Sequence, residues 1–221
     1  MARFLFPRWS NKVLPFTIFF VLGPLGTAAL GALWYYGSPK HMEVGYQPVQ
    51  PVPYSHKLHA GDLGIDCRYC HTTVEQSAFS QVPPTETCMN CHSKIGTESL
   101  KLQPVRESFA TGQPIPWVRV HNLPDYAFFD HSAHMAAGVG CKSCHGRVDQ
   151  MIEVIVSQPL SMAWCIECHR DPRAHVRDLS KTTVTNMDWE PSAEQLAASG
   201  PVKATNGREV DPPVHCSGCH R

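Results

Sequence analysis

The chain has 221 residues and carries 19 Lys plus Arg against 19 Asp plus Glu, so its formal net charge is zero. A protein without excess basic charge lacks the electrostatic footprint of nucleic-acid binding, and no nucleic-acid partner is expected. The composition also includes 19 Pro and 15 Gly. This content of residues that interrupt regular structure predicts short helices and irregular segments beyond the N-terminal region, rather than long helices or a sheet.

The first predicted element is an apolar helix over 13–36, a stretch without a charged residue. At about 1.5 Å per residue it reaches roughly 36 Å, enough to cross a bilayer with some tilt. Trp9 precedes the stretch and an aromatic cluster, Trp34 to Tyr36, closes it, as is typical of membrane interfaces. We therefore predict a transmembrane anchor over 13–36, in contact with the lipid bilayer.

Positive charge predicts the orientation of this anchor. Three cations precede it and one follows it, namely Arg3, Arg8, Lys12 and Lys40. This bias places residues 1–12 in the cytoplasm. The alternative is a cleaved signal peptide with its cleavage site among the small residues at 27–32, but the apolar run exceeds the roughly 7–15 residues of a signal core. Both alternatives export the rest of the chain, and a bacterial inner-membrane protein with a periplasmic domain is expected.

A Pro-rich linker over 37–53 should run extended. Beyond it, all ten Cys fall into five copies of one pattern, C-x-x-C-H: CRYCH, CMNCH, CKSCH, CIECH and CSGCH. A C-x-x-C pair alone fits a zinc half-site, a redox dithiol or disulfide, or a covalent c-type haem. Only the haem requires the His, because that His binds the iron. With 13 His in 221 residues, five such matches arise by chance on the order of once in a million.

We therefore predict a domain over 54–221 that is mainly irregular, with short α-helices wrapped around five covalent c-type haems. The predicted thioether ligands are Cys67, Cys70, Cys88, Cys91, Cys141, Cys144, Cys165, Cys168, Cys216 and Cys219. The predicted proximal iron ligands are His71, His92, His145, His169 and His220.

An internal duplication supplies candidates for the opposite face of each haem. An aromatic residue followed by H-x-x-H stands shortly before Cys67 and again before Cys141, and each block continues to a second motif. The predicted modules are 54–120 and 121–180, with a fifth-haem segment over 181–221. Two His three residues apart on a helical turn share a face, so each could bind one of two neighbouring irons. The predicted distal ligands are His56, His59, His131 and His134. Which of them serves which iron stays open, and a pair of surface His is the alternative interpretation.

One distal ligand is then still required. Met187 is the favoured candidate, because Trp189 stands beside it and a thioether would raise the potential of its haem. The alternative is His121, which lies in a short stretch ahead of the second H-x-x-H. Weaker candidates are His41, His175 and His215.

The stretches HNLPDYAFFDHSAH, GCKSCHG and LSMAWCIECHR, together with five motifs behind one anchor, give the chain a family resemblance. It resembles the pentahaem cytochrome c subunit of bacterial alternative complex III, a quinol:electron-acceptor oxidoreductase of the respiratory chain. The resemblance implies an iron–sulfur protein, polytopic quinol-binding subunits and a monohaem cytochrome c as partners, with a downstream cytochrome or terminal oxidase as acceptor. A quinone-reducing relative in sulfate reducers has similar modules, so the direction of electron flow stays open.

The expected function is electron transfer through five haems, without a catalytic site in this chain. Two other functions compete with it. A multihaem periplasmic reductase of a small oxyanion would need one iron with an open coordination position. A tethered stand-alone quinol dehydrogenase would need a quinol pocket, and a single transmembrane helix provides little surface to enclose one.

Overall fold

The computed structural model describes residues 7, 9–38 and 43–220. Two compact units make up the chain, Met1–Glu43 and Val44–Arg221. His41 lies outside the described residues, as do Arg3, Arg8 and Lys40, on which the predicted orientation of the anchor partly rests.

The N-terminal unit is one helix of 27 residues, from Ser10 to Tyr36. It consists of α1 (Ser10–Thr17), a π-helical turn η1 (Ile18–Leu22) and α2 (Gly23–Tyr36). In the π-helical turn the Gly23 N–H donates to the Ile18 carbonyl, five residues back. Pro24 follows and has no N–H to donate, which interrupts the ordinary ladder at this point.

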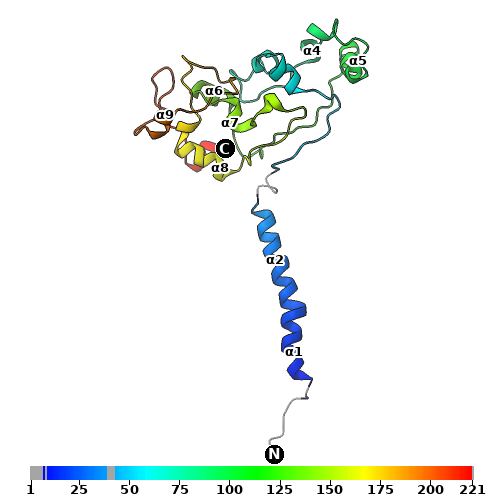
Figure 1. Cartoon of the computed structure of the whole chain (residues 1–221), viewed down its shortest axis with the longest axis vertical. Coiled ribbons are helices and arrows are strands. Elements are labelled where there is room, and N and C mark those ends of the chain that lie inside the picture. The colour runs from blue at the N-terminus through cyan, green and yellow to red at the C-terminus, as the bar shows by residue number, and fades with distance from the viewer. Residues whose placement is uncertain (1–6, 8, 39–42, 221) are drawn as a thin grey trace, which may run out of the picture. The chain divides into compact units, whose positions relative to one another are not determined.

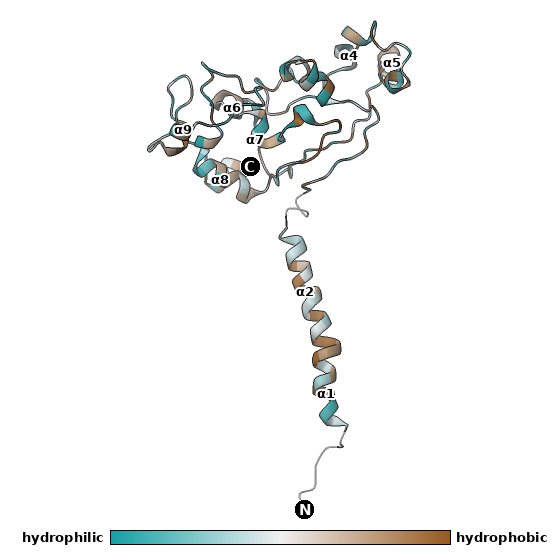
Figure 2. Cartoon of the chain, in the orientation of Figure 1, coloured by the Kyte–Doolittle hydropathy of each residue, from teal (hydrophilic) through white to brown (hydrophobic). Residues whose placement is uncertain are grey.

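This helix has the length and composition of a candidate membrane span, with a mean hydropathy of 1.9, although a signal sequence near an N-terminus meets the same criteria. None of its described residues is buried, and Figure 2 shows apolar residues along its length. Thr17 and Thr27 donate their hydroxyls to the carbonyls of Val13 and Gly23, at 2.8 Å each. Their polar groups are therefore satisfied within the helix, as a bilayer requires.

The C-terminal unit contains only short helices joined by irregular segments (Figure 1). They are η2 (Lys57–Asp62), α3 (Cys67–Cys70), α4 (Thr85–His92), η3 (Leu100–Leu102), α5 (Gln103–Thr111), α6 (His131–Ala137), α7 (Cys141–His145), η4 (Val148–Gln150), α8 (Met162–Arg170), η5 (Pro172–Ala174), α9 (Ala193–Ala197) and α10 (Cys216–Cys219). Within 43–220 there is no β-strand beyond isolated bridges such as Ala127 with His220. The predicted mixture of short helices and irregular chain is confirmed.

The apolar core of this unit is thin. Across the described residues the buried apolar side chains are Val52, Val105, Met135, Val156, Val176, Val184 and Met187. Burial of one such side chain contributes only about 1.5–3 kcal/mol, whereas ordering each residue of a domain costs about 1–2 kcal/mol of backbone entropy. The unit therefore fits a fold whose interior is completed by large apolar groups.

Two helix boundaries are set by local chemistry around the second H-x-x-H. The Asp130 carboxylate caps α6 by accepting from the Ser132 N–H at 2.8 Å. Gly138 ends α6 with φ of 88°, and a Cβ at this position would lie 2.6 Å from the Arg177 carbonyl oxygen. Glycine is thus required there by both backbone conformation and space.

Arg177 is the most deeply buried large side chain among the described residues, at 1% exposure. Its Nη1 donates to the carbonyls of Thr183, Val184 and Asn186, at 2.7–3.2 Å, and its guanidinium lies 4.7 Å from the Trp189 ring centroid. The charge therefore organises the segment 183–189, which packs against the third motif through a bond from the Cys141 N–H to the Val184 carbonyl (3.1 Å).

The two repeated segments are joined through their backbones. The Lys57 N–H donates to the Met151 carbonyl at 2.9 Å, and the Ser132 N–H donates to the Ser77 carbonyl at 3.3 Å. Lys57 and Ser132 each directly follow the first His of an H-x-x-H. Each H-x-x-H turn is therefore anchored on the other module.

Candidate haem-binding site

Each C-x-x-C pair lies on a helical turn, in α3, α4, α7, α8 and α10. Residues three apart on such a turn share a face, so both thiols of a motif can reach one porphyrin edge. Eight of the ten thiols are partly buried, and those of Cys91 and Cys216 are exposed. The local fold thus presents every Cys pair in the way that two thioether bonds to one group require.

Three of the predicted distal His face a predicted proximal His across a nearly constant gap. The ring centroids of His59 and His92 are 6.2 Å apart, and those of His134 and His169 are 6.1 Å apart. Two metal–nitrogen bonds of about 2 Å plus half a ring on either side give roughly 6 Å between two imidazoles that share one metal ion. These spacings fit one iron between each pair.

The third pair joins His131 to His145, at 6.5 Å with the two rings only 7° from parallel. Burial, followed by the charges of His121 and His131, lowers the pKa of His145 to about 3. A His with so low a pKa stays neutral at physiological pH, which is the form that binds a metal.

His56 lies near the remaining proximal ligand. Burial lowers the pKa of His56 to about 4, and the charge of His71 is the next contribution. His56 and His131 occupy the same position in the two copies of H-x-x-H. Since His71 and His145 are equivalent in the same way, the repeat predicts that His56 faces His71 as His131 faces His145.

In seven candidate ligands the Nδ1 atom of the His ring, which is not the one expected to bind iron, is hydrogen bonded to a backbone carbonyl. The Nδ1···O contacts are His59 with Ser55, His71 with Gln81, His92 with Ile95, His131 with Ala78, His134 with Asp130, His169 with Pro213 and His220 with Tyr126, at 2.7–3.1 Å. A carbonyl oxygen only accepts, so Nδ1 must carry the proton. Nε2 is then left with its lone pair free for a metal, and the ring cannot rotate away.

Two aromatic residues support the H-x-x-H pairs in the same way. Tyr54 lies 4.5 Å from the His59 ring and 4.8 Å, edge to face, from the His56 ring. Phe129 repeats this arrangement at 4.5 Å from His134 and 4.8 Å from His131. Sequence reasoning noted the aromatic residue as part of the repeat but gave it no role. Its constant position ahead of the first His was the available signal.

The fifth motif pairs with the chain just ahead of Phe129. The Phe128 N–H donates to the Cys219 carbonyl at 2.7 Å, and the ring of His220 lies 5.8 Å from that of Tyr126. Met187 is buried in the segment held by Arg177, against the third motif. The role of Met187 as the distal ligand of the fifth haem remains a prediction.

The alternative ligand, His121, is partly buried, and its Nε2 is buried without a partner in the described structure. Its ring centroid lies 4.5 Å from that of His145, edge to face. This gap is too short for an iron between these two rings. Burial holds the pKa of His121 below its usual value, so the ring is kept neutral.

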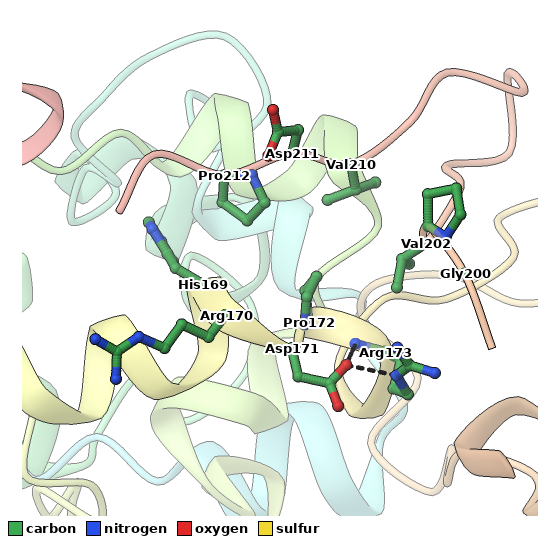
Figure 3. A pocket seen from close by; sticks show the side chains of 11 residues that line it. His169, Arg170, Asp171, Pro172, Arg173, Gly200, Val202, Val210, Asp211 and Pro212 are labelled. Carbon is green, nitrogen blue, oxygen red and sulfur yellow. Dashed lines mark hydrogen bonds and ion pairs between the residues drawn. The ribbon is translucent and has the colours of Figure 1, made fainter. Parts of the chain in front are cut away.

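A cavity of about 140 Å³ lies beside the fourth motif (Figure 3). His169 and Pro212 stand at one end, and at the other Asp171 accepts from Nε of Arg173 at 2.5 Å. Residues 200–202 and 210–212 close the remaining side. The cavity marks where the C-terminal segment folds back on α8, and its lining includes His169, one of the paired rings.

Comparison with known proteins agrees with this chemistry. Residues 127–221 match the family model of cytochrome c7 and related cytochrome c, which implies covalently bound c-type haem. The class that the motifs, the paired rings and this match support is that of multihaem cytochromes c.

A particular relative matches as well. The chain is 36% identical over 100 residues to the multihaem cytochrome c subunit of menaquinone reductase from Nitratidesulfovibrio vulgaris. The matched region is 45% of this chain and 47% of the relative, so it spans about half the length of that protein. That relative is the cytochrome subunit of a menaquinone reductase, and the match does not single out the alternative complex III family.

Proposed function

We propose that the chain is the electron-transfer subunit of a quinone-linked membrane oxidoreductase and binds five c-type haems. The observation that carries the proposal is the set of His ring pairs at 6.1–6.5 Å, each joining a residue of an H-x-x-H to the His of a C-x-x-C-H motif. A haem iron held by two nitrogen ligands exchanges one electron and has no free position for a substrate. Electron transfer, rather than bond chemistry, follows from this ligand set.

The ligand assignment within the proposal follows the geometry. His59 pairs with His92, His131 with His145, and His134 with His169. His56 completes the set with His71. For His220, Met187 remains the proposed distal ligand and His121 the alternative. The thioether bonds come from the ten Cys of the motifs.

The ratio of covalent haem to protein tests the cofactor content directly. Intact mass combined with pyridine haemochrome absorbance should give five haems per chain. A colourless preparation, or one with markedly fewer haems, would contradict the proposal and favour zinc or disulfides at the motifs.

The competing oxyanion reductase needs an iron with an unoccupied coordination position. The fifth haem is the candidate for such an iron, because its distal ligand is the one that no ring pair identifies. Carbon monoxide added to the reduced protein should leave the spectrum unchanged if all five irons are six-coordinate. Stoichiometric binding at one haem would favour the reductase. Binding that disappears in a Met187→His variant would identify that haem as the fifth.

The complex to which the subunit belongs is proposed from likeness. The family resemblance favours alternative complex III, in which electrons leave quinol, together with an iron–sulfur protein, polytopic subunits and a monohaem cytochrome c. The identity to a menaquinone reductase subunit favours the reverse direction as a second candidate. The proposed location is the bacterial inner membrane, with the anchor over 13–36, the N-terminus cytoplasmic and the haem domain periplasmic.

Purification from solubilised membranes separates these candidates. A complex that oxidises quinol with a cytochrome acceptor supports alternative complex III, and one that reduces menaquinone supports the other. A subunit that purifies alone and oxidises quinol by itself would establish the stand-alone dehydrogenase instead.

A further inference from the structure

The thiols of the five motifs form a continuous series of neighbours. In chain order the motifs are motif 1 (67–71), motif 2 (88–92), motif 3 (141–145), motif 4 (165–169) and motif 5 (216–220). Contacts between them reveal which motifs lie side by side, and the spatial order differs from the order along the chain.

Motifs 1 and 2 are neighbours. Burial raises the pKa of the Cys70 thiol, and the charge of Cys88 adds to the effect. The Tyr54 ring packs on both His56 and His59, at 4.8 and 4.5 Å, and His59 in turn faces His92 of motif 2. A hydrogen bond from Asn90 to the Tyr69 hydroxyl, at 3.0 Å, ties the two helices together.

Motif 1 also touches motif 3. The Cys67 and Cys141 thiols lie close enough that each is the largest influence on the pKa of the other, which lowers that of Cys67 and raises that of Cys141. Asp66, which caps α3, accepts from the Thr185 hydroxyl at 3.0 Å. The adjoining Val184 carbonyl accepts from the Cys141 N–H. The same short segment therefore holds both motifs.

Motifs 3 and 4 follow, and motif 5 comes last. His131 and His134, three residues apart, face His145 of motif 3 and His169 of motif 4, so these two motifs are neighbours. Burial also raises the pKa of the Cys144 thiol, with Cys168 and then Cys165 as the further causes. For Cys165 the cause after burial is Cys219 of motif 5. The Nδ1 of His169 lies 2.8 Å from the Pro213 carbonyl, directly ahead of motif 5.

The two ends of this series carry the exposed thiols. Cys91 of motif 2 and Cys216 of motif 5 are exposed, whereas the eight other Cys are partly buried.

We propose that the motifs stand in the spatial order 2–1–3–4–5, so that motifs 2 and 5 are the ends at which redox partners exchange electrons. The inference rests on the proposed function, because it orders the haems that the motifs would hold. Motif 1, first in the chain, then lies inside the series, and electrons pass from motif 2 to motif 3 only through it.

Photoreduction from one end tests this order in the full-length, detergent-solubilised haem protein. Asp211→Cys introduces a free thiol near motif 5, and since the native Cys carry thioether bonds, a ruthenium photoreductant attaches there alone. His56→Met and His59→Met, made separately, mark motifs 1 and 2 with the distinct absorption of a Met-ligated haem. The marker at motif 1 should be reduced several-fold faster than the marker at motif 2.

The matched control places the label at the other end, with Glu98→Cys beside motif 2, where the order of the two markers should reverse. A motif 2 marker reduced before or together with the motif 1 marker from Asp211→Cys would overturn the proposed order. A failure of the proposed function would give a different result from a failure of the proposed order. In that case the protein without marker substitutions would carry fewer than five haems or show no electron transfer between them.

A haem-deletion variant supplies an independent arm that needs no marker. Cys88→Ala combined with Cys91→Ala removes the group at motif 2. The four remaining haems should still equilibrate after a flash at the Asp211→Cys label. If instead one of the four is cut off, the motifs follow chain order and the inference is wrong.

Discussion

At the scale of single residues, the candidate ligands differ in which backbone carbonyl accepts the hydrogen bond from their Nδ1. His59 and His134 bond to the carbonyls four residues back, of Ser55 and Asp130, which a helical turn supplies by itself. His71 and His169 depend on carbonyls of distant chain, those of Gln81 and Pro213. The first kind of support could be anticipated from the H-x-x-H spacing, and the second required the fold.

A ligand exchange at His134 should act on one haem alone. Since His134 faces His169, His134→Met would replace a nitrogen ligand with a thioether, which raises the reduction potential. A redox titration followed by optical absorption should show one of five haems shifted upward, with the haem count unchanged. The same substitution at His175, which forms no ring pair with a proximal His among the described residues, is the control and should leave all potentials in place.

His121 should make stability depend on pH. Burial holds its pKa below the ordinary 6.5, so as pH falls the unfolded chain takes up this proton first. The contribution of His121 to stability is therefore complete above about pH 6.5 and declines below it. Denaturation of His121→Gln should show a smaller loss of stability on acidification than the unchanged protein.

His215→Gln, at an exposed position, is the control for this measurement and should retain the original pH dependence. Equal slopes in the two variants would contradict the role of burial. The visible spectrum of His121→Gln provides a separate readout: a changed ligand signature would make His121, rather than Met187, the fifth distal ligand.

At the scale of elements, the two H-x-x-H turns differ in detail. The first leads into the π-helical η2, and the second forms part of the α-helical α6 with a carboxylate cap. Despite this difference, both place an aromatic ring 4.5 Å from the second His. The shared geometry follows from local spacing, while the helix type follows from the tertiary contacts of each turn.

Gly61 is the residue in η2 that such a contact constrains. A Cβ at this position would collide with the Asp149 carbonyl oxygen of the other module. Gly61→Ala should therefore destabilise the haem domain by about 1–3 kcal/mol, as overpacking against backbone does. Thermal or urea denaturation measures the change. Gly31→Ala, at a position with no neighbouring atom within 4 Å, should be neutral, and an equal loss in both variants would sink the explanation.

At the scale of the whole molecule, only seven apolar side chains are buried among the described residues, so we expect folding to require the attached haems. Polypeptide produced without haem attachment should lack a cooperative unfolding transition, whereas the haem-loaded protein should show one. Calorimetry of the two forms makes the comparison. A cooperative transition of similar size in the haem-free form would contradict this interpretation.

The two compact units predict that the anchor can be removed. Residues 44–221, exported behind a cleavable signal peptide, should carry the same haem count and spectrum as the full chain, because they form a compact unit of their own. They should partition into the aqueous phase after cell fractionation. Loss of haems on truncation would show that the N-terminal unit contributes to the cofactor sites.

The sequence was sufficient for the features that depend on local spacing. It predicted the helix over 13–36 and the lack of a sheet. The proximal and distal candidates also come from local spacing, because C-x-x-C-H and H-x-x-H need only neighbouring residues, and their role as ligands remains a prediction. It did not predict the pairing of His59 with His92, since this depends on how α4 folds back toward η2. The meeting of Cys67 with Cys141 also lies beyond local pattern, because 74 positions separate them.

The bonds from Lys57 to Met151 and from Ser132 to Ser77 have a consequence for the origin of this arrangement. Lys57 and Ser132 are equivalent positions of the duplicated segments, as are Cys67 and Cys141, which contact each other. Equivalent residues meet in this reciprocal way across a twofold axis, as in an isologous homodimer. The internal copies thus relate to each other as the subunits of such a dimer do, and each copy supplies backbone acceptors that hold the H-x-x-H turn of the other.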